Sequence, residues 1–165
     1  MTTAYDKSIV SNIEGYLVTK LGAITEIPTG NVDILAGVRD LEGMEDVNEF
    51  LMAERTPRVL VSWQGFTRAG RGEGQRDRIE RFSIWVCVKN VRPGKARVGE
   101  SATDVGTNRI VEEIDAAIDD DTSTDVDSSD NFAIGQVNVE SGNVIYRPGG
   151  VNIVEMTVTI RTVPV

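Results

Sequence analysis

The sequence predicts a single α+β domain, in which helices pack on one face of a mostly antiparallel sheet. Apolar residues recur at three- and four-residue spacing in some segments and at every second position in others. These are the spacings of amphipathic helices and of half-buried strands. Strand segments follow one another in pairs and triples between the helical ones, which favours antiparallel pairing. A chain of 165 residues can bury one core of its own.

The first third of the chain is predicted to be mostly helical. Residues 5–21 carry apolar side chains at helical spacing, and Gly22 ends the pattern in the usual way for a helix C-terminus. A second helix is expected at residues 45–54, before Pro57. Between the two helices we expect a short strand at residues 23–27, a turn at 28–31 and an irregular acidic segment at 31–39.

A long, protruding β-hairpin is predicted over residues 57–91, and the rest of the chain is organised around it. Its strands are residues 58–64 and 79–90, and both carry apolar residues at every second position. The tip, residues 65–78, is rich in glycine and arginine, too long for a tight turn and too polar for a core. Tips of this kind commonly bind something. One face of the second strand carries Phe82, Ile84, Val86 and Val88.

Beyond the hairpin, the sequence predicts a basic loop at residues 91–99, a helix at 101–119 and three strands. Ser101 or Thr103 would cap the helix, whose buried stripe includes Ile110 and Ile114. Residues 112–130 hold nine acidic side chains and no basic one, so we expect a mobile acidic loop at residues 119–130. The strands are expected at residues 133–139, 143–147 and 151–163, with a turn at Ser141 and Gly142 between the first two.

The charge of the chain is divided into three parts. Residues 1–54 contain ten acids and three bases, residues 55–97 contain eleven bases and three acids, and residues 98–165 contain thirteen acids and three bases. The net charge of −9 therefore conceals a cationic hairpin between two acidic segments. Such a layout can close on itself within one molecule, or it can make subunits attract one another head to tail.

The sequence offers little that would support catalysis, and we expect neither an enzyme nor a metal or cofactor site. There is no histidine, the commonest general base and zinc ligand, and the single cysteine, Cys87, is expected to be an inert thiol packed in a strand. The glycines at residues 70–74 do not have the spacing of a phosphate-binding loop. Residues 125–136 lack the glycine and the glutamate that a calcium loop requires at its sixth and twelfth positions.

The sequence also gives no sign of a membrane segment or a secretion signal. No apolar run approaches the roughly 20 residues of a membrane-spanning helix. The N-terminus is polar and lacks the basic-then-apolar pattern of a signal peptide. We therefore expect synthesis in the cytoplasm and no membrane partner.

The hairpin carries the candidate interface. A basic stripe of this kind can bind phosphates or dock on an acidic protein surface, and the chain itself supplies acidic surface. Only Phe66 and Phe82 interleave with the arginines, which makes a thin stacking platform for single-stranded nucleic acid. Protein contact is therefore the favoured interpretation. The predicted interface residues are Arg68, Arg71, Arg76, Arg78, Arg81 and Trp85.

The order of these elements resembles a known family. An amphipathic helix leads to a hairpin that begins Thr-Pro-Arg-Val-Leu-Val-Ser-Trp, with Phe-Ser-Ile-Trp-Val-Cys-Val in its second strand. A helix with Asn-Arg-Ile-Val-Glu-Glu-Ile follows, and the chain ends on the long strand Ile-Val-Glu-Met-Thr-Val-Thr-Ile. This layout, over residues 9–163, is similar to the tail-terminator proteins of contractile-tailed phages, in particular the small Mu-like ones. The acidic segment and the Arg- and Gly-rich tip have no counterpart in the family pattern.

The resemblance implies a structural protein of the virion tail, present in the host cytoplasm during assembly. It implies a homohexameric ring that caps the tail tube, stops its polymerisation and joins the tail to the neck. The partners would be tube, sheath and neck or connector proteins, with genomic DNA passing through the ring without sequence-specific binding. The resemblance carries over no catalytic residues. A neighbouring neck or tail-completion protein, and a nucleic-acid-binding module that uses the arginines of the hairpin, are the main alternatives. A host-directed adaptor or small-ligand binder is a further one.

Overall fold

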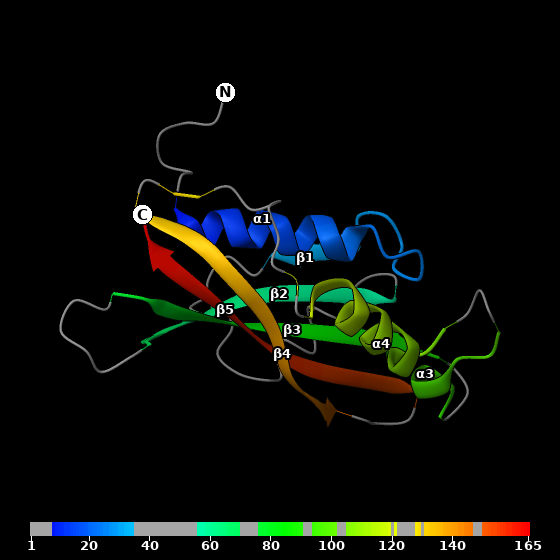
Figure 1. Cartoon of the computed structure of the whole chain (residues 1–165). Helices are drawn as coiled ribbons and strands as arrows, with labels where there is room; N and C mark the ends of the chain where they lie inside the picture. Colours follow the sequence, from blue (N-terminus) through cyan, green and yellow to red (C-terminus); the bar gives the residue numbers. More distant parts are fainter. Residues whose placement is uncertain are drawn as a thin grey trace.

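The fold is built on a five-stranded mixed sheet in the order β1-β2-β3-β5-β4 (Figure 1). A computed structural model of the chain describes residues 8–34, 56–69, 76–90, 94–101, 105–119, 121, 128–129, 131–146 and 150–165. Only β1 pairs in parallel, with β2, and the other three pairings are antiparallel. The strands are β1 Val32–Ile34, β2 Arg58–Arg68, β3 Arg78–Lys89, β4 Phe132–Tyr146 and β5 Val151–Pro164.

Three helices of the described chain pack on one face of this sheet: α1 Ile9–Gly22, α3 Lys95–Val98 and α4 Thr107–Ile118. The core between the layers joins the apolar stripes of α1 and α4 to every second residue of the central strands. This arrangement confirms the predicted α+β class and the single small domain. The largest fully buried side chains of this core are Ile13, Leu17, Leu21, Phe82, Ile84, Ile110, Ile114, Ile118 and Met156.

The first helix and its exit differ from the prediction in detail. Helix α1 begins after Ser8, whose side chain accepts a hydrogen bond from the Ser11 N–H at 3.1 Å, the usual arrangement at a helix N-terminus. The strand predicted at residues 23–27 is wrong, because this segment forms successive turns that carry the chain away from the helix. Residues 32–34, predicted to be irregular, form β1 instead. The helix predicted at residues 45–54 lies outside the described residues.

The first strand of the hairpin is longer than predicted, and both strands belong to the sheet along their described length. Strand β2 continues four residues past its predicted end, with a register shift between Trp63 and Gly65. Strand β3 is paired with β2 on one side and with β5 on the other, up to the Arg78–Thr162 pair. The long protruding hairpin is therefore not confirmed. Residues 70–75, the centre of the predicted tip, lie outside the described residues.

The single helix predicted at residues 101–119 is also wrong at its start. Helix α4 begins at Thr107, after Gly106, while the short α3 lies in the segment predicted to be a basic loop. A side chain at Gly106 would place its Cβ 2.2 Å from the Arg97 carbonyl oxygen. This close approach between the α3 segment and the start of α4, which only glycine allows, fixes where α4 begins.

Strand β4 replaces two predicted strands. It runs without a turn through Ser141 and Gly142, and three register irregularities let it bend along β5. At the end of α4, the Asp119 carboxylate accepts the Val139 N–H at 2.8 Å. The Asp121 carboxylate accepts the Tyr16 hydroxyl at 2.5 Å. These two members of the predicted mobile acidic loop are therefore bound to β4 and α1, and residues 120, 122–127 and 130 of that loop lie outside the described residues.

Candidate interface at the hairpin end of the sheet

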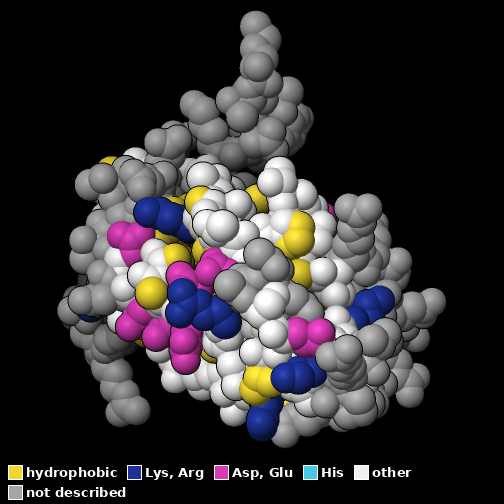
Figure 2. All heavy atoms as spheres, turned by 90° about the vertical axis from the view of Figure 1, so that its right-hand side faces the viewer, with side chains coloured by type: hydrophobic (Ala, Val, Ile, Leu, Met, Phe, Trp, Pro, Cys, Tyr) yellow, Lys and Arg dark blue, Asp and Glu magenta, His cyan; other side chains and the backbone are white. Residues whose placement is uncertain are grey.

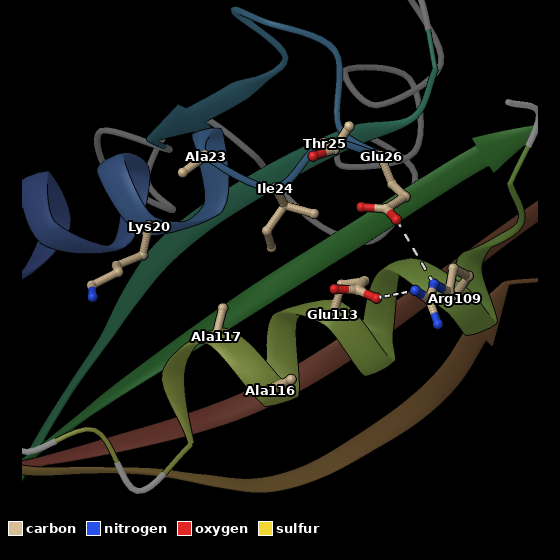
Figure 3. A pocket seen from close by; sticks show the side chains of 9 residues that line it. All are labelled: Lys20, Ala23, Ile24, Thr25, Glu26, Arg109, Glu113, Ala116 and Ala117. Atoms are coloured by element: carbon tan, nitrogen blue, oxygen red, sulfur yellow. Dashed lines mark ion pairs between the residues drawn. The ribbon is translucent and has the colours of Figure 1, made fainter. Parts of the chain in front are cut away.

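One place where the described residues gather polar side chains is a hollow between α1 and α4. Its volume is about 480 Å³, and its lining includes Lys20, Ala23, Ala116 and Ala117 (Figure 3). The Arg109 guanidinium points across it and forms ion pairs with Glu113 and, at 3.8 Å, with Glu26. Arg109 is therefore already engaged by two carboxylates, and among the described residues it is not free to select a ligand.

The surface at the α3 and α4 end of the molecule has the same mixed character. Figure 2 shows basic side chains beside acidic ones on this face, with hydrophobic side chains only singly or in small groups. Such a surface is ordinary for an exposed face of a globular domain. A second place, at the opposite end of the sheet, is different.

At the hairpin end, the helix-covered face of the sheet changes from apolar to polar and aromatic. The register places Trp63 opposite Phe82 and Phe66 opposite Glu80. Since alternate residues share a face, Glu80 and Arg78 continue the row that Phe82, in the core, belongs to. The sheet therefore directs a carboxylate and a guanidinium toward the side on which its core is built.

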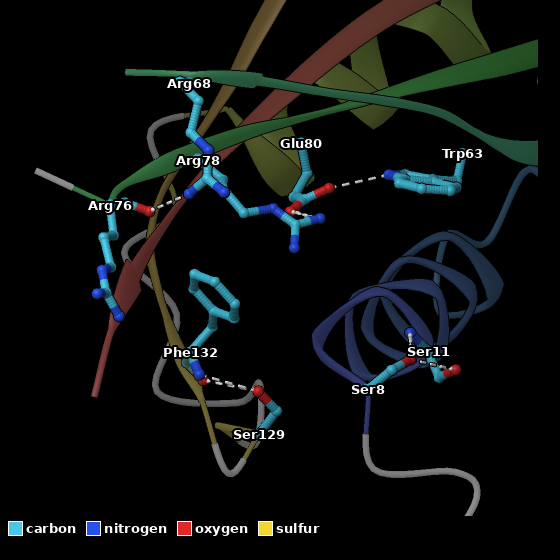
Figure 4. Close-up of polar contacts among 9 residues, drawn as sticks. All are labelled: Ser8, Ser11, Trp63, Arg68, Arg76, Arg78, Glu80, Ser129 and Phe132. Atoms are coloured by element: carbon cyan, nitrogen blue, oxygen red, sulfur yellow. Dashed lines mark hydrogen bonds and ion pairs between the residues drawn. The ribbon is translucent and has the colours of Figure 1, made fainter. Parts of the chain in front are cut away.

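Glu80 is a fully buried carboxylate, with 0% of its surface exposed. Its Oε2 accepts the Trp63 Nε1–H at 2.9 Å, and its Oε1 lies 2.7 Å from Arg78 Nη2 (Figure 4). An unpaired carboxylate at this depth would cost several kcal/mol of folding free energy, so the charge of Arg78 is needed to keep it there. Trp63 and Arg78 are in turn held in fixed positions by the carboxylate.

The guanidinium of Arg78 lies close to two aromatic rings from different strands. Its central carbon is 3.7 Å from the ring centre of Phe66, in β2, and 5.0 Å from that of Phe132, at the start of β4. Arg68 also approaches the Phe66 ring, at 5.7 Å. Cations over aromatic faces are attracted by the ring quadrupole, more strongly when they are partly desolvated. Figure 4 shows the Arg78 side chain extending toward Glu80, with Phe132 close by.

We call these six residues the hairpin-end cluster: Trp63, Phe66, Arg68, Arg78, Glu80 and Phe132. Part of the cluster faces solvent, since Trp63 is 36% and Phe66 44% exposed. Tryptophan, phenylalanine and arginine are the residue types enriched in protein interfaces and in their energetic hot spots. The cluster therefore has the composition of a binding surface.

The cluster also has unused hydrogen-bonding capacity. Although Arg78 is ion-paired with Glu80, the pair is not aligned as a hydrogen bond, and the described residues give Glu80 Oε1 and Arg78 Nε, both buried, no hydrogen-bond partner. The hydroxyl of Thr162, the β5 residue paired with Arg78, is likewise buried with no hydrogen-bond partner among the described residues. Buried polar groups without partners are uncommon in folded proteins. Three such buried polar groups in one small region indicate a site that has not been optimised for stability alone.

The structure divides the predicted interface residues between two faces. Arg68 and Arg78 are cross-strand neighbours on the helix side, and Arg76 is exposed beside them, its carbonyl accepting a hydrogen bond from Arg68 Nη1 at 3.2 Å. Arg81 is exposed on the opposite face of the sheet, because it is one residue away from Glu80 in β3 and alternate residues share a face. Trp85 is on that face too, but it is only 6% exposed and so lies in the interior of this chain. The sixth, Arg71, lies outside the described residues.

The sequence reasoning missed Glu80, the residue that organises the cluster. A signal was present, because Glu80 and Arg78 have the same strand parity as Phe82 and Ile84 and so fall on the core face. Trp63 likewise shares its parity with Val61. Opposite charges two residues apart on a buried face predict an internal ion pair, whereas the arginines alone had suggested only a solvent-exposed basic stripe.

No protein-family model and no curated protein sequence matches this chain. Within the described ranges, no three histidine, cysteine, aspartate or glutamate side chains are grouped so that they could hold a metal ion. None of the helices in those ranges is both long and apolar enough to cross a membrane. The hairpin-end cluster is therefore the candidate site that the geometry itself supports.

Proposed function

We propose that this protein is a structural component of a contractile phage tail: a ring that caps the tail tube, stops its polymerisation and joins the tail to the neck. The observation that carries the proposal is the hairpin-end cluster, an aromatic and arginine-rich surface held rigidly by the buried Glu80. A surface of this composition fits a protein partner better than a small molecule. The resemblance in element order supplies the identity of the assembly.

Self-association into a ring is supported by the charge layout. Five of the six cluster residues, all but Phe132, lie in the segment of eleven bases, while α4 and the segment after it are strongly acidic. Unlike surfaces on one molecule attract copies head to tail, and such a heterologous contact produces a closed ring when its rotation closes. The ring would leave a central channel through which genomic DNA passes without sequence-specific contacts. A neck or tail-completion protein of the same virion region would use the same contact.

The test is the mass and shape of the purified full-length protein. Light scattering over a range of protein and salt concentrations should detect a particle of about six times the monomer mass, and low salt should favour it. Electron microscopy should show rings, free or at the ends of tail tubes. A strict monomer at high protein concentration and low salt, together with tubes that carry no added ring, would contradict the proposal.

A nucleic-acid-binding module is the second candidate, because Phe66 and Arg68 offer an exposed ring and a cation on one face. The variant Arg68→Ser with Arg76→Ser separates the two functions. If the protein forms a ring through this surface, the variant loses assembly, whatever its affinity for DNA. For a nucleic-acid module, it assembles as the wild type does and loses DNA affinity, with a reduced dependence of that affinity on salt. Arg81→Ser, on the other face of the sheet, is the matched control.

A further inference from the structure

A groove on the outer side of α4 has features complementary to the hairpin-end cluster. It lies between α4 and the second half of β4, and its volume is about 270 Å³. Its apolar lining comes from Val111, Val139 and Met156, and its acidic lining from Glu112, Asp115 and Glu140. We call it the α4–β4 groove.

The groove exists because β4 has a glycine where its neighbours on this face have side chains. A Cβ added at Gly142 would lie 3.9 Å from Met156 Cγ and 4.0 Å from Val111 Cγ1, which is ordinary van der Waals contact. The fold would therefore accept a side chain at this position. Glycine instead leaves room above the buried Met156, beside the partly exposed Val111 and Val139. Glycine within a strand commonly marks a place where another chain approaches.

Two carboxylates at the groove are available for a partner. Glu112 and Asp115 are exposed on α4, and the described residues supply neither with an ion pair or a side-chain hydrogen bond. Glu140 is different, because its Oε1 already accepts the Thr159 hydroxyl at 3.0 Å. At the hairpin end, the exposed cations Arg68 and Arg76 likewise have no ion pair among the described residues.

The two surfaces cannot meet within one molecule. Met156 lies in the groove, and Thr162, beside the hairpin-end cluster, is six residues further along β5. This separation corresponds to about 20 Å along a rigid strand. Figure 1 shows the hairpin end of β2 and β3 on one side of the molecule and α4 toward the other. A contact between them must therefore join two copies.

Within the described residues, the strand edges beside both surfaces also lack a further strand partner. Strand β1 covers the outer edge of β2 only as far as Val61. On β4, the Asp121 carbonyl and the Asp119 carboxylate accept the N–H groups of Val137 and Val139. Past that point, the described chain gives residues 141–146 no backbone partner other than β5. An edge that no described strand covers, beside each surface, allows main-chain contacts to add to side-chain docking.

We propose that the α4–β4 groove is the receptor for the hairpin end of a second copy of this chain. Phe66 of one copy occupies the apolar bottom at Gly142, while Arg68 and Arg76 pair with Glu112 and Asp115 at the rim. The proposal deepens the proposed function and rests on it, because it names the contact that would build the ring. The same contact repeats around the ring, since each copy offers one hairpin end and one groove.

Charge reversal tests the pairing directly. The hairpin reversal is Arg68→Glu with Arg76→Glu, and the groove reversal is Glu112→Arg with Asp115→Arg. Each alone should prevent assembly, because like charges then meet at the contact. The two variants mixed in equal amounts should assemble, and so should a chain that carries both reversals. Arg81→Glu and Asn108→Arg, which place comparable charge changes on exposed sites outside the contact, should assemble as the wild type does.

Cross-linking provides a second readout that does not depend on charge. The variant Arg76→Cys with Glu112→Cys should give a ladder of covalent oligomers with a short bis-maleimide reagent, and each single variant should not. The native Cys87 is fully buried and does not compete for the reagent. Gly142→Leu should fill the groove and abolish both the ladder and assembly while leaving the melting temperature close to that of the wild type.

The possible results separate the two proposals. If the wild type assembles but the groove reversal and Gly142→Leu assemble equally well, the receptor is elsewhere and this inference is wrong, while the ring proposal stands. If the wild type neither self-associates nor binds to tail tubes, both are wrong. Rescue by the mixture of the two reversals is the result that only a hairpin-to-groove contact produces.

Discussion

The middle and the hairpin end of β3 present the same face of one strand to the same side of the sheet, yet they serve different purposes. In the middle, Phe82, Ile84 and Val86 are fully buried against apolar side chains from the helices and from β5. Two residues beyond Phe82, the row continues with Glu80 and then Arg78. The comparison shows that burial alone does not identify a core, because Glu80 is as buried as Ile84 but is held by an ion pair and a tryptophan.

The difference has a physical cause. An apolar side chain gains free energy from burial itself, whatever its orientation. A buried charge loses hydration and recovers it only through correctly placed partners. The middle of β3 is therefore a source of stability, and its end is a region where stability depends on specific geometry. That geometry holds Trp63 and Phe66 in fixed positions at the surface, which lowers the entropy lost when a partner binds.

The largest effect is expected in the middle of the strand. Phe82→Ala should lower the free energy of unfolding by about 3–5 kcal/mol, because it leaves a cavity in the core that the sheet cannot collapse to fill. Urea unfolding followed by far-UV circular dichroism measures this. Val144→Ala, at a residue 47% exposed, is the control, and its effect should be below about 0.5 kcal/mol. Equal losses of unfolding free energy in Phe82→Ala and Val144→Ala would show that the middle of β3 is not a special source of stability.

A somewhat smaller loss is expected at the end of the strand. Glu80→Ala should cost about 3 kcal/mol, since it leaves the Arg78 charge partly buried without its partner. Glu80→Gln keeps an acceptor for the Trp63 N–H and should cost less. Unfolding free energies compare the two variants, and the fluorescence of Trp63 in a Trp85→Phe background reports whether the indole is released. A Glu80→Ala variant as stable as the wild type would show that the ion pair does not hold the cluster together.

The exposed arginines of the hairpin end should matter least for stability. Arg68→Ser with Arg76→Ser should change the free energy of unfolding by less than about 0.5 kcal/mol, because both side chains are exposed and have no carboxylate partner among the described residues. The same variant is expected to lose assembly. A stability loss as large as that of Glu80→Ala would mean that these arginines belong to the fold rather than to an interface.

Cys87, on the other face of the middle of β3, should be unreactive in the folded protein. Burial raises the pKa of its thiol from its ordinary 9.0 to about 11, against the opposing effect of the nearby Lys89 and Arg58 charges. Since the thiolate is the reactive form, labelling by a thiol reagent at pH 8 should follow unfolding only. The unfolded thiol ionises near pH 9 and the folded one near 11. The contribution of this thiol to the free energy of unfolding should therefore be fully present below pH 9 and be lost between pH 9 and 11. Rapid labelling of the native protein would show that this part of the sheet opens.

Much of the fold could be predicted from the sequence because it depends on local periodicity. The stripes of α1 and α4 and the alternation in β3 and β5 are patterns that each segment carries by itself. The core face of β5, with Val154, Met156, Val158 and Ile160 buried, is as the alternation predicts. Hydrophobic burial acts on each side chain separately, so a face can be assigned without knowing what covers it.

Other features were decided only when distant segments met. The start of α4 depends on the contact of Gly106 with Arg97, and β1 is a strand only because β2 lies beside it. The hairpin-end cluster is the clearest case. Trp63, Arg78 and Phe132 come from three strands, and no segment alone shows that Trp63 and Arg78 meet at Glu80 while Phe132 lies against Arg78. The sequence determined where the apolar faces lie, because burial needs no particular neighbour. The tertiary structure decided where charges could be buried, because an ion pair depends on the distance and direction between two specific groups.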